Sequence, residues 1–379
     1  MRILSIDISG RVVRYDDALY EAMVKECSKD DLLICGTPYK IRTTPQLKFS
    51  LWNFIPKEIA GSPSKFKKML KALEVFLNYI KLAFIISKYK PDILHLQWLP
   101  FLEICRIECI FLYFYKLLNK KLRIVLTVHN IYPHNFSEKK KQKYRKRFIG
   151  IKSLLDRFIV HTKSSVEELE KEFGIKKDTV NVIKHGVFIP TNIPKKNKKE
   201  DDKCVILIYG GQSYYKGTDI FIDAINKLPV NYKKIVDVRI IGKTSNELVS
   251  LLEKSANIIY WNNSFILDEE LNQEIVNADL LVYPYRQISQ SGALLLGLFF
   301  EKPIIASNLP SFIETLENYP SDLFFISEDS DSLMNSIIYF LSMENSSKKN
   351  LLSILKGIKI NNSWQASAKQ TLELYKKLV

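Results

Sequence analysis

The sequence predicts an α/β fold with two domains, each built on a parallel sheet that carries helices on both faces. Short apolar runs alternate with helical patterns along the chain, which is the order that repeated βαβ units produce. One stretch interrupts the alternation, because residues 190–203 are polar and charged, hold two prolines and are typical of a linker. With 379 residues the chain is long enough for two separate cores.

The first domain is expected over residues 1–190, the linker over 191–203, the second domain over 204–360 and a final helix over 361–379. The expected strands of the first domain are Ile3–Ile8, Asp31–Cys35, Ile93–Gln97, Ile124–His129, Arg157–His161 and Val180–Ile183. Its expected helices are Tyr15–Cys27, Ser64–Lys88, Phe101–Leu118, Glu138–Leu155 and Ser165–Phe173.

The second domain repeats this alternation. Its expected strands are Val205–Tyr209, Val236–Ile241, Asn257–Tyr260, Leu280–Tyr285, Pro303–Ala306 and Leu323–Ile326. Its expected helices are Thr218–Lys227, Asn246–Ser255, Asp268–Asn277, Ala293–Phe300 and Ser332–Met343, followed by an amphipathic helix at Trp364–Leu378. Ligands of parallel sheets bind outside the carboxyl ends of the strands, so two such domains imply a cleft between them.

The composition is that of a globular protein with reduced thiols. Hydrophobic residues make up 46% and charged residues 26% of the chain, which argues against a disordered protein. The five cysteines are scattered, as in cytosolic proteins rather than in disulfide-stabilised secreted ones. Cys105 and Cys109 lie four residues apart on an expected helix. No histidine is near them in sequence, so we expect two small buried hydrophobic residues and no metal site.

No targeting or membrane-spanning segment is expected. Met1 leads directly into a strand pattern instead of a signal peptide. The longest apolar stretches, Leu73–Ser87 and Ile110–Leu118, fall short of the ~20 residues that span a bilayer. We therefore expect a cytoplasmic protein.

The net charge of +15 lies in the first half, where residues 1–190 hold 35 Lys and Arg against 19 Asp and Glu. The segments 64–90 and 139–148 mix basic residues with aromatic and aliphatic ones. Such segments suit an anionic membrane face, although a solvated basic surface would leave the same pattern. Nucleic-acid binding would also use this charge, but no nucleic-acid motif accompanies it, and we expect no nucleic-acid partner.

The most informative loop joins the apolar run Leu280–Tyr285 to the expected helix Ala293–Phe300. Free backbone N–H groups at a helix start favour anions, phosphate above all. Arg286, early in the loop, could add a fork of donors suited to phosphate oxygens. The residues nearest the helix start are Gln290, Ser291, Gly292 and Ala293.

A second loop follows the first strand of the second domain. Gly210 and Gly211 would let the backbone approach a diphosphate closely, and Lys216 could supply a point charge. The loop has neither the Walker spacing nor the dinucleotide GxGxxG spacing. Alone it is equally well an ordinary turn, but together with the Arg286 loop it favours phosphate binding.

Three further candidates follow strands. Glu314 could accept hydrogen bonds from sugar hydroxyls or could simply stabilise a helix start. His129 ends a very apolar strand, where either a donor or acid facing a cleft or a structural histidine would fit. Gly10 and Arg11 lie just past the first strand and would approach the same edge.

A series of short motifs runs through most of the chain. They are PDILHLQW (91–98), LTVHN (126–130), DRFIVHT (156–162), VIKHGV (182–187), the loop 210–217, FILDEEL (265–271), ADLLVYPYR (278–286) and KPIIAS (302–307). Their order and spacing resemble the GT-B glycosyltransferases, which have two Rossmann-like domains facing a central cleft. The resemblance is to the large retaining family 4 (group 1) of nucleotide-sugar enzymes in particular.

The resemblance implies a role for each candidate. The second domain would bind the nucleotide-sugar, with Lys216 on the diphosphate and the backbone of residues 291–293 capping it. Glu314 stands where the family has a Glu in its last donor-side motif. His129 would contact the donor sugar near the reacting carbon. Acceptor-side candidates are Gly10, Arg11 and His134, and the final helix would cross back to the first domain.

The sequence also departs from the family pattern. The family's paired glutamates, eight positions apart, would fall at Ile288 and Leu296, or one residue later at Ser289 and Gly297. The arginine usual in the first donor loop appears as Ser213, and Arg286 could partly replace it. A Gln-Ser-Gly loop of this kind resembles a subset of the family associated with bacterial surface polysaccharides such as lipopolysaccharide or capsule.

The resemblance implies a retaining hexosyl- or deoxyhexosyl-transferase that acts on a growing, lipid-linked glycan. His129, Lys216 and Arg286 are its expected catalytic residues. No DxD-type aspartate pair follows a suitable strand, so we expect transfer without metal or other cofactor. A lipid-linked acceptor and the basic first half favour peripheral attachment to the inner face of the cytoplasmic membrane. The alternatives are a nucleotide-sugar 2-epimerase on the same fold and a non-catalytic basic module that binds membrane or nucleic acid.

Overall fold

The computed structural model describes residues 1–38, 47–53, 65–133, 136–190, 192–197, 202–254 and 259–379. The chain divides into two compact units. Unit 1 is Met1–Gly186 together with Trp364–Val379, and unit 2 is Val187–Ser363. Each unit is built on one parallel sheet with helices on both faces, which confirms the expected fold class.

The sheet of unit 1 has the strand order β3-β2-β1-β4-β5-β6-β7, and all neighbouring strands are parallel. Strands β1 and β4 are neighbours, and the chain builds the sheet outward from this pair in opposite directions. The strands are β1 (Arg2–Ile6), β2 (Leu32–Thr37), β3 (Leu47–Ser50), β4 (Ile93–Leu96), β5 (Arg123–Thr127), β6 (Arg157–Val160) and β7 (Val180–Val182).

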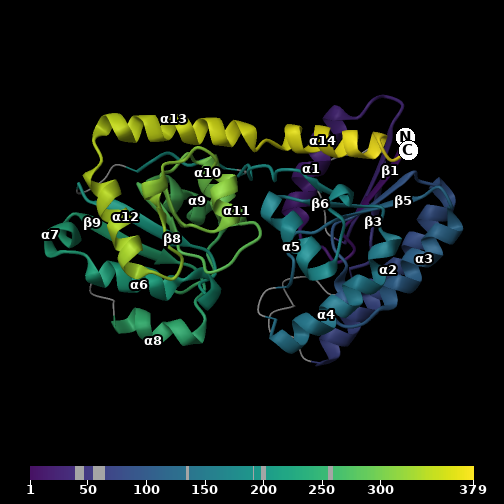
Figure 1. Ribbon diagram of the computed structural model, residues 1–379, viewed down its shortest axis with the longest axis horizontal. Coiled ribbons are helices and arrows are strands. Elements are labelled where there is room, and N and C mark those ends of the chain that lie inside the picture. Colours follow the sequence, from purple (N-terminus) through teal and green to yellow (C-terminus); the bar gives the residue numbers. More distant parts are fainter. Residues whose placement is uncertain (39–46, 54–64, 134–135, 191, 198–201, 255–258) are drawn as a thin grey trace. The chain divides into compact units, whose positions relative to one another are not determined.

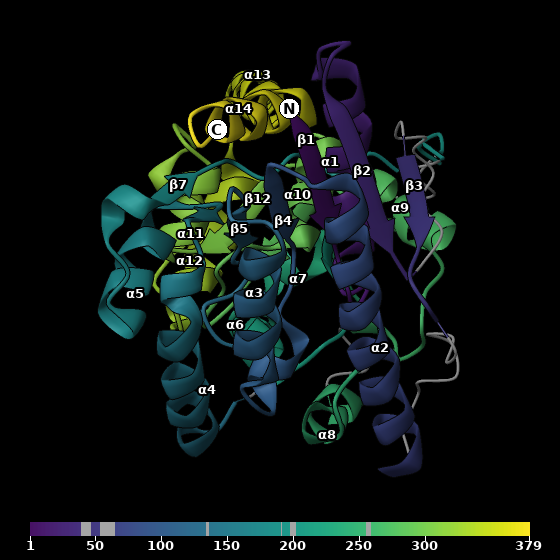
Figure 2. The same ribbon diagram turned by 90° about the vertical axis from the view of Figure 1, so that its right-hand side faces the viewer.

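Helices cover both faces of this sheet. Three of them, α2, α3 and α4, lie side by side over one face (Figure 2). Helix α1 lies on the opposite face, as the right-handed connection from β1 to β2 requires. There it packs against α14. The helices are α1 (Val13–Glu26), α2 (Lys65–Tyr89), α3 (Ile107–Leu118), α4 (Glu138–Ile151), α5 (Lys163–Phe173) and α14 (Trp364–Lys376), with 3₁₀ turns η2 (Pro100–Glu103), η3 (Lys152–Leu154) and η4 (Lys177–Thr179).

The sheet of unit 2 has the order β10-β9-β8-β11-β12-β13, again with parallel neighbours. Apolar side chains of β8 and β11 are buried in the centre of its core. The strands are β8 (Cys204–Tyr209), β9 (Val236–Ile241), β10 (Ile259–Asn262), β11 (Leu280–Tyr283), β12 (Ile304–Ser307) and β13 (Phe324–Phe325).

In unit 2, α6 and α8 cover one face of the sheet, and α9, α10 and α13 cover the other (Figure 1). The helices are α6 (Thr218–Lys227), α7 (Val230–Lys234), α8 (Asn246–Lys254), α9 (Asp268–Asn277), α10 (Gly292–Phe299), α11 (Pro310–Thr315), α12 (Ser330–Ser342) and α13 (Asn345–Asn361), with 3₁₀ turns η5 (Tyr214–Lys216) and η6 (Ser321–Leu323).

One expected helix begins later than predicted. The segment Phe101–Leu118 splits into η2 and α3, because the buried carboxylate of Glu108 accepts a hydrogen bond from the Phe101 N–H at 2.9 Å and folds the segment back. Elements β3, α7, α11 and α13 were not predicted. Helix α13 was missed because its first residues are polar. Its buried side chains, Leu351, Leu355 and Ile358, nevertheless recur at helical spacing.

No helix among the described residues combines the length and the apolar character needed to cross a bilayer.

Candidate active site

The phosphate-binding candidates of unit 2 collect where the strand order reverses. Strands β8 and β11 are parallel neighbours, and the Gly210 loop follows β8 while the Arg286 loop follows β11. The remaining strands extend away from this pair in opposite directions. In parallel α/β sheets, ligands bind at this reversal point. The fold therefore brings together the two loops that the sequence singled out.

Close backbone packing holds the two loops against each other. The Arg286 N–H donates to the Tyr215 carbonyl at 2.8 Å. Gly217 has a φ of +68°, and a Cβ on it would lie 1.8 Å from the Pro284 carbonyl oxygen. Only glycine fits this position without moving a loop.

Lys216 is a buried cation beside the Gly210 turn. It is 9% exposed, and its Nζ would lie 3.0 Å from a Cβ built on Gly210. The same Nζ lies 5.5 Å from the ring centroid of Tyr285. Among the described residues no carboxylate forms an ion pair with Lys216, and burial lowers the pKa of its ammonium. A buried charge without a partner is unfavourable, so this position favours an anion.

Arg286 does have a partner. Its two terminal nitrogens donate to both carboxylate oxygens of Asp219, at 2.8 and 2.7 Å, and one of them also donates to the Tyr214 carbonyl at 2.6 Å. The hydrogen bonds to Asp219 raise the pKa of Arg286. The guanidinium therefore ties the loop after β11 to η5 and to the first turn of α6.

The start of α10 lies in the second loop. Ser291 is the N-cap, and its hydroxyl accepts a hydrogen bond from the Leu294 N–H at 3.2 Å. The N–H groups of Gly292 and Ala293 precede that capped position and have no acceptor within the helix. The Ala293 carbonyl accepts a hydrogen bond from the Tyr209 hydroxyl at 2.5 Å. This bond anchors the helix start to the end of β8.

Tyr285 connects Lys216 to the helix start. Its ring lies beneath the Lys216 Nζ. Burial raises the pKa of Tyr285 to about 12, and a hydrogen bond with the Ser291 side chain opposes that increase. The cation and the N–H groups at the helix start therefore belong to one local site in unit 2.

The other candidates of unit 2 lie around this site. Gly211 is exposed, and Gln290 is half-buried. Glu314 is half-buried on α11, a helix that the Ser311 hydroxyl ties to the loop through the Ile288 carbonyl at 2.8 Å. The structure gives a physical reason for one departure from the family pattern. A Cβ at Gly297 would lie 2.4 Å from the Tyr283 hydroxyl, so a glutamate has no room there.

In unit 1, the acceptor-side candidates also lie where the strand order reverses. Gly10 has a φ of +64°, and its N–H donates to the Asp7 carboxylate at 2.9 Å. Arg11 pairs with Glu103 at 2.5 Å and lies over the ring of Trp98, 5.1 Å from its centroid. His134 lies outside the described residues.

His129 belongs to a cluster of aromatic rings. Its ring lies 4.7 Å from that of Tyr15, 6.3 Å from that of Trp98 and 5.3 Å from that of His161, measured between centroids. Its Nε2 is buried without a hydrogen-bond partner among the described residues. Burial lowers the pKa of His129 well below its usual value, and the neighbouring histidines add to the effect. The imidazole is therefore neutral at physiological pH.

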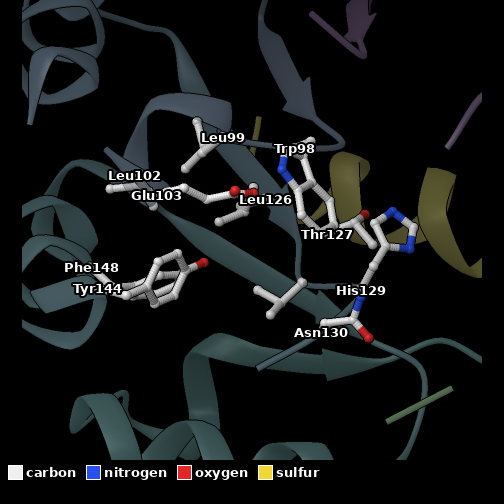
Figure 3. Close-up of a pocket in the computed structure, with 11 residues that line it drawn as sticks. Trp98, Leu99, Leu102, Glu103, Leu126, Thr127, His129, Asn130, Tyr144 and Phe148 are labelled. Atoms are coloured by element: carbon white, nitrogen blue, oxygen red, sulfur yellow. The ribbon is translucent and has the colours of Figure 1, made fainter. Parts of the chain in front are cut away.

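A pocket opens beside His129 (Figure 3). It encloses about 340 Å³, including space open to solvent. Its polar side chains include those of Glu103, Thr127, His129 and Asn130, and Trp98 forms part of its wall. The remaining lining residues are Leu99, Leu102, Leu126, Val128, Tyr144 and Phe148.

Sequence reasoning did not identify several residues of these sites. In the sequence, Asp219 is an ordinary acidic residue in a first helical turn. Nothing in the sequence links it to Arg286. Trp98 ends the quoted motif PDILHLQW (91–98) but was given no role, and Glu103 lies outside the quoted motifs. The five cysteines are free thiols, and no three or more His, Cys, Asp or Glu of the described residues are grouped as metal ligands.

Two family models match the chain. The model described as Glycosyltransferase Family 4 matches residues 53–189, and the one described as Glycosyl transferases group 1 matches residues 203–343. The first match lies in unit 1 and ends just past it, and the second lies in unit 2.

A curated relative from Xanthomonas campestris pv. campestris is a GDP-mannose:glycolipid 4-beta-D-mannosyltransferase. It is 24% identical over 238 residues, which cover 59% of this chain and 62% of the relative. The chain thus spans somewhat less than two thirds of the length of the curated relatives that it matches.

Solved structures share the fold over the whole chain. The glycosyltransferase from Rickettsia africae ESF-5 has a TM-score of 0.69 at 18% identity and covers 100% of this chain and 98% of its own. The Anabaena protein HepE, in complex with UDP, has a TM-score of 0.64 at 13% identity and covers 99% of both chains. With both halves matched by family models and the fold shared from end to end, the chain belongs to the family 4 (group 1) glycosyltransferases of the GT-B fold.

Proposed function

We propose that the protein transfers a hexosyl or deoxyhexosyl group from a nucleotide-sugar to a growing, lipid-linked glycan of a bacterial surface polysaccharide. Unit 2 holds the nucleotide-sugar and unit 1 holds the acceptor. The observation that carries the proposal is Lys216, a buried ammonium without a carboxylate partner among the described residues, at the strand-order reversal of unit 2. A diphosphate would supply the missing negative charge.

The chemistry follows from where charge develops. When the bond between the sugar and the diphosphate breaks, negative charge grows on the leaving β-phosphate. The Lys216 ammonium and the N–H groups of Gly292 and Ala293 are fixed before the reaction and stabilise that charge. One such preorganised donor is worth ~3–4 kcal/mol of barrier. These groups serve the leaving phosphate without a metal ion.

Arg286 acts mainly by holding the loops in this proposal. Its charge is already offset by Asp219, at 2.8 and 2.7 Å, which leaves less of it for a phosphate. Lys216 is therefore the main cation at the leaving group. Gly210 and Gly211 allow the backbone to approach the diphosphate, and Glu314 accepts hydrogen bonds from the donor.

His129 acts as a neutral hydrogen-bonding group on the donor sugar. Its lowered pKa argues against a protonated imidazole as acid at neutral pH. Its Nε2, which lacks a partner among the described residues, could instead exchange a hydrogen bond with a sugar hydroxyl. Arg11 and the Gly10 turn would serve the acceptor.

The acceptor class is supported by the relative and by charge. The name of the Xanthomonas relative gives GDP-mannose as its donor and a glycolipid as its acceptor. By analogy, the donor of this chain is a nucleotide-sugar and its acceptor is a glycolipid. The basic helix α4 has seven Lys and Arg against one Glu, which suits work on lipid-linked glycans at the anionic inner face of the cytoplasmic membrane.

The family resemblance predicts that the sugar keeps its anomeric configuration, whereas the beta-mannoside in the relative's name is an inverted product of the alpha-linked GDP-mannose. The anomeric proton of the product, followed by nuclear magnetic resonance from the first turnover, tests this. Inversion would contradict the prediction and would require a base that deprotonates the acceptor hydroxyl.

The proposal is tested by thermal-shift screening with UDP, GDP, TDP and their sugars, followed by product analysis with a lipid-linked acceptor. We expect one nucleotide series to raise the melting temperature and its sugar to be transferred. Stabilisation by none of them would remove the enzyme interpretation. Formation of the C2 epimer of the nucleotide-sugar, or of the free epimerised sugar with the nucleoside diphosphate after hydrolysis, with no glycan product, would favour the 2-epimerase instead.

A further inference from the structure

Helix α2 has two apolar faces. One is buried against the sheet of unit 1 and includes Val75, Tyr79, Leu82 and Ile86. The other is a stripe of exposed side chains at helical spacing, Phe66, Met69, Leu73, Ile80 and Phe84, which are 62, 60, 51, 36 and 72% exposed. A surface helix needs only one apolar face to pack on its own domain, so the second face has another use.

Helix α3 shows the same feature. Ile110, Tyr113, Phe114 and Leu117 recur at helical spacing and are 68, 58, 45 and 54% exposed. The opposite side of α3 packs inward through the buried residues Glu108, Leu112 and Tyr115.

The two helices form one rigid pair. They lie side by side over the same face of the sheet (Figure 2). The Tyr79 hydroxyl donates to Glu108 at 2.6 Å, and the Tyr115 hydroxyl donates to the Tyr79 carbonyl at 2.7 Å. The ring of Phe111 stacks on that of Tyr79 with centroids 4.9 Å apart. These contacts fix the helices, while both stripes stay outside the core.

We propose that the outer surface of α2 and α3 docks the protein onto an anionic lipid bilayer, with the two apolar stripes inserted among the lipids. This surface, hereafter the α2–α3 surface, consists of the nine exposed residues of the two stripes. The proposal rests on the proposed function only for its purpose, which is to bring unit 1 to a lipid-linked acceptor. Its physical basis is the exposed apolar area and the charge around it.

Charge argues for lipid as the occupant. Helix α2 contains six lysines against one glutamate, and the neighbouring α4 has seven basic residues against one acidic. Interfacial helices combine such cations with an inserted apolar face. A second copy of the chain would bring two basic surfaces together, which opposes self-association through this face.

A tryptophan lies beside the α2 stripe. Trp52 is 40% exposed, its backbone N–H and carbonyl are held by the Asn78 side chain at 2.7 and 3.0 Å, and the Lys81 Nζ lies 5.2 Å from its ring centroid. Tryptophan beside lysine is typical of the interface between lipid chains and headgroups. Trp52 is therefore a natural reporter of docking.

The test is vesicle flotation with the full chain, using phosphatidylglycerol–phosphatidylethanolamine vesicles and neutral phosphatidylcholine vesicles, without donor or acceptor. Wild type should float with the anionic vesicles and bind less at high salt. Phe84→Ser with Ile110→Ser should weaken partitioning at least tenfold. The matched control, Val230→Ser with Ile360→Ser, removes side chains of similar exposure, 67 and 72%, from unit 2 and should bind as wild type.

Lipids with brominated chains should quench the emission of Trp52, and Trp52→Phe should remove that quenching. Equal binding of wild type and the Phe84/Ile110 variant would overturn the proposal. So would a concentration-dependent dimer that the same variant dissociates, since the occupant would then be a second copy. Because no sugar is present, a failure of transferase activity would not affect this result.

Discussion

Arg286 and Asp219 form a two-pronged ion pair, with nitrogen–oxygen distances of 2.8 and 2.7 Å, that joins the loop after β11 to the first turn of α6. The guanidinium also lies 3.8 Å from the centroid of the Tyr214 ring. The ion pair thus holds the loop after β11 against α6 beside the neighbouring strands β8 and β11 of unit 2. The proposed diphosphate would bind between the loops that follow these two strands.

If the pair positions the loops, removing either partner should have similar effects. We expect Arg286→Ala and Asp219→Ala each to raise the KM for the donor, and the double variant to be little worse than the poorer single variant. The coupling should be about 1–2 kcal/mol in a double-mutant cycle on kcat/KM. A far larger loss for Arg286→Ala than for Asp219→Ala would instead indicate that Arg286 contacts phosphate directly.

Lys216→Ala should lower kcat/KM by about 10²–10³, because it removes a preorganised cation from the leaving group. Lys227→Ala is the matched control. That lysine lies on the adjacent helix α6 in exposed ion pairs with Asp223 and Asp331, which are worth little. Steady-state kinetics with a saturating acceptor measures both. Unchanged turnover in Lys216→Ala would remove this residue from the diphosphate site.

Gly217→Ala should destabilise unit 2 by at least ~2 kcal/mol, since the added Cβ would meet the Pro284 carbonyl in a backbone region that alanine avoids. Gly357→Ala, on the exposed side of α13 with no atom within 4 Å of the new Cβ, should stabilise it by about 0.5–1 kcal/mol. Urea unfolding of both variants measures these two changes in the free energy of unfolding. A tolerated alanine at position 217 would mean that the loops do not pack as described.

Stability should fall as the pH falls from 6.5 towards 4, through the buried histidines of unit 1. Burial lowers the pKa of His95 to about 3 and that of His161 to about 4. Both stay neutral when folded and take up protons when unfolded. Each therefore costs up to ~1.4 kcal/mol per pH unit below 6.5.

Urea unfolding of wild type and His161→Gln between pH 7 and 5 isolates this effect. Glu108 acts in the opposite direction, since burial raises its pKa to about 8, but it contributes equally to both proteins. The difference in unfolding free energy between wild type and His161→Gln should become smaller as the pH falls. A constant gap would show that His161 does not titrate with unfolding.

Much of the fold could be predicted from the local sequence pattern, but only part of the candidate site could. β9, α6 and α9 have the predicted bounds, because their apolar residues recur with the period of a strand or a helix. The helix predicted over Phe101–Leu118 fails because the Glu108 carboxylate captures a backbone N–H seven residues away. Local pattern cannot show that contact.

The site shows the same division. Lys216 and the Ser291–Ala293 helix start could be predicted, since a glycine turn and a strand–loop–helix boundary have local signals. The Arg286–Asp219 pair could not, because its partners are 67 residues apart. The second apolar faces of α2 and α3 could not be distinguished from core by periodicity alone. Only the packing of Tyr79, Phe111 and Tyr115 shows which face is buried.

The central claim is that Lys216 holds the diphosphate of a nucleotide-sugar. Calorimetric titration of UDP, GDP and TDP into wild type, Lys216→Ala and Lys227→Ala tests it most directly. We expect one nucleotide to bind wild type and Lys227→Ala alike, and to bind Lys216→Ala at least tenfold more weakly. Binding of none of the three to wild type, or equal binding to Lys216→Ala, would contradict the account.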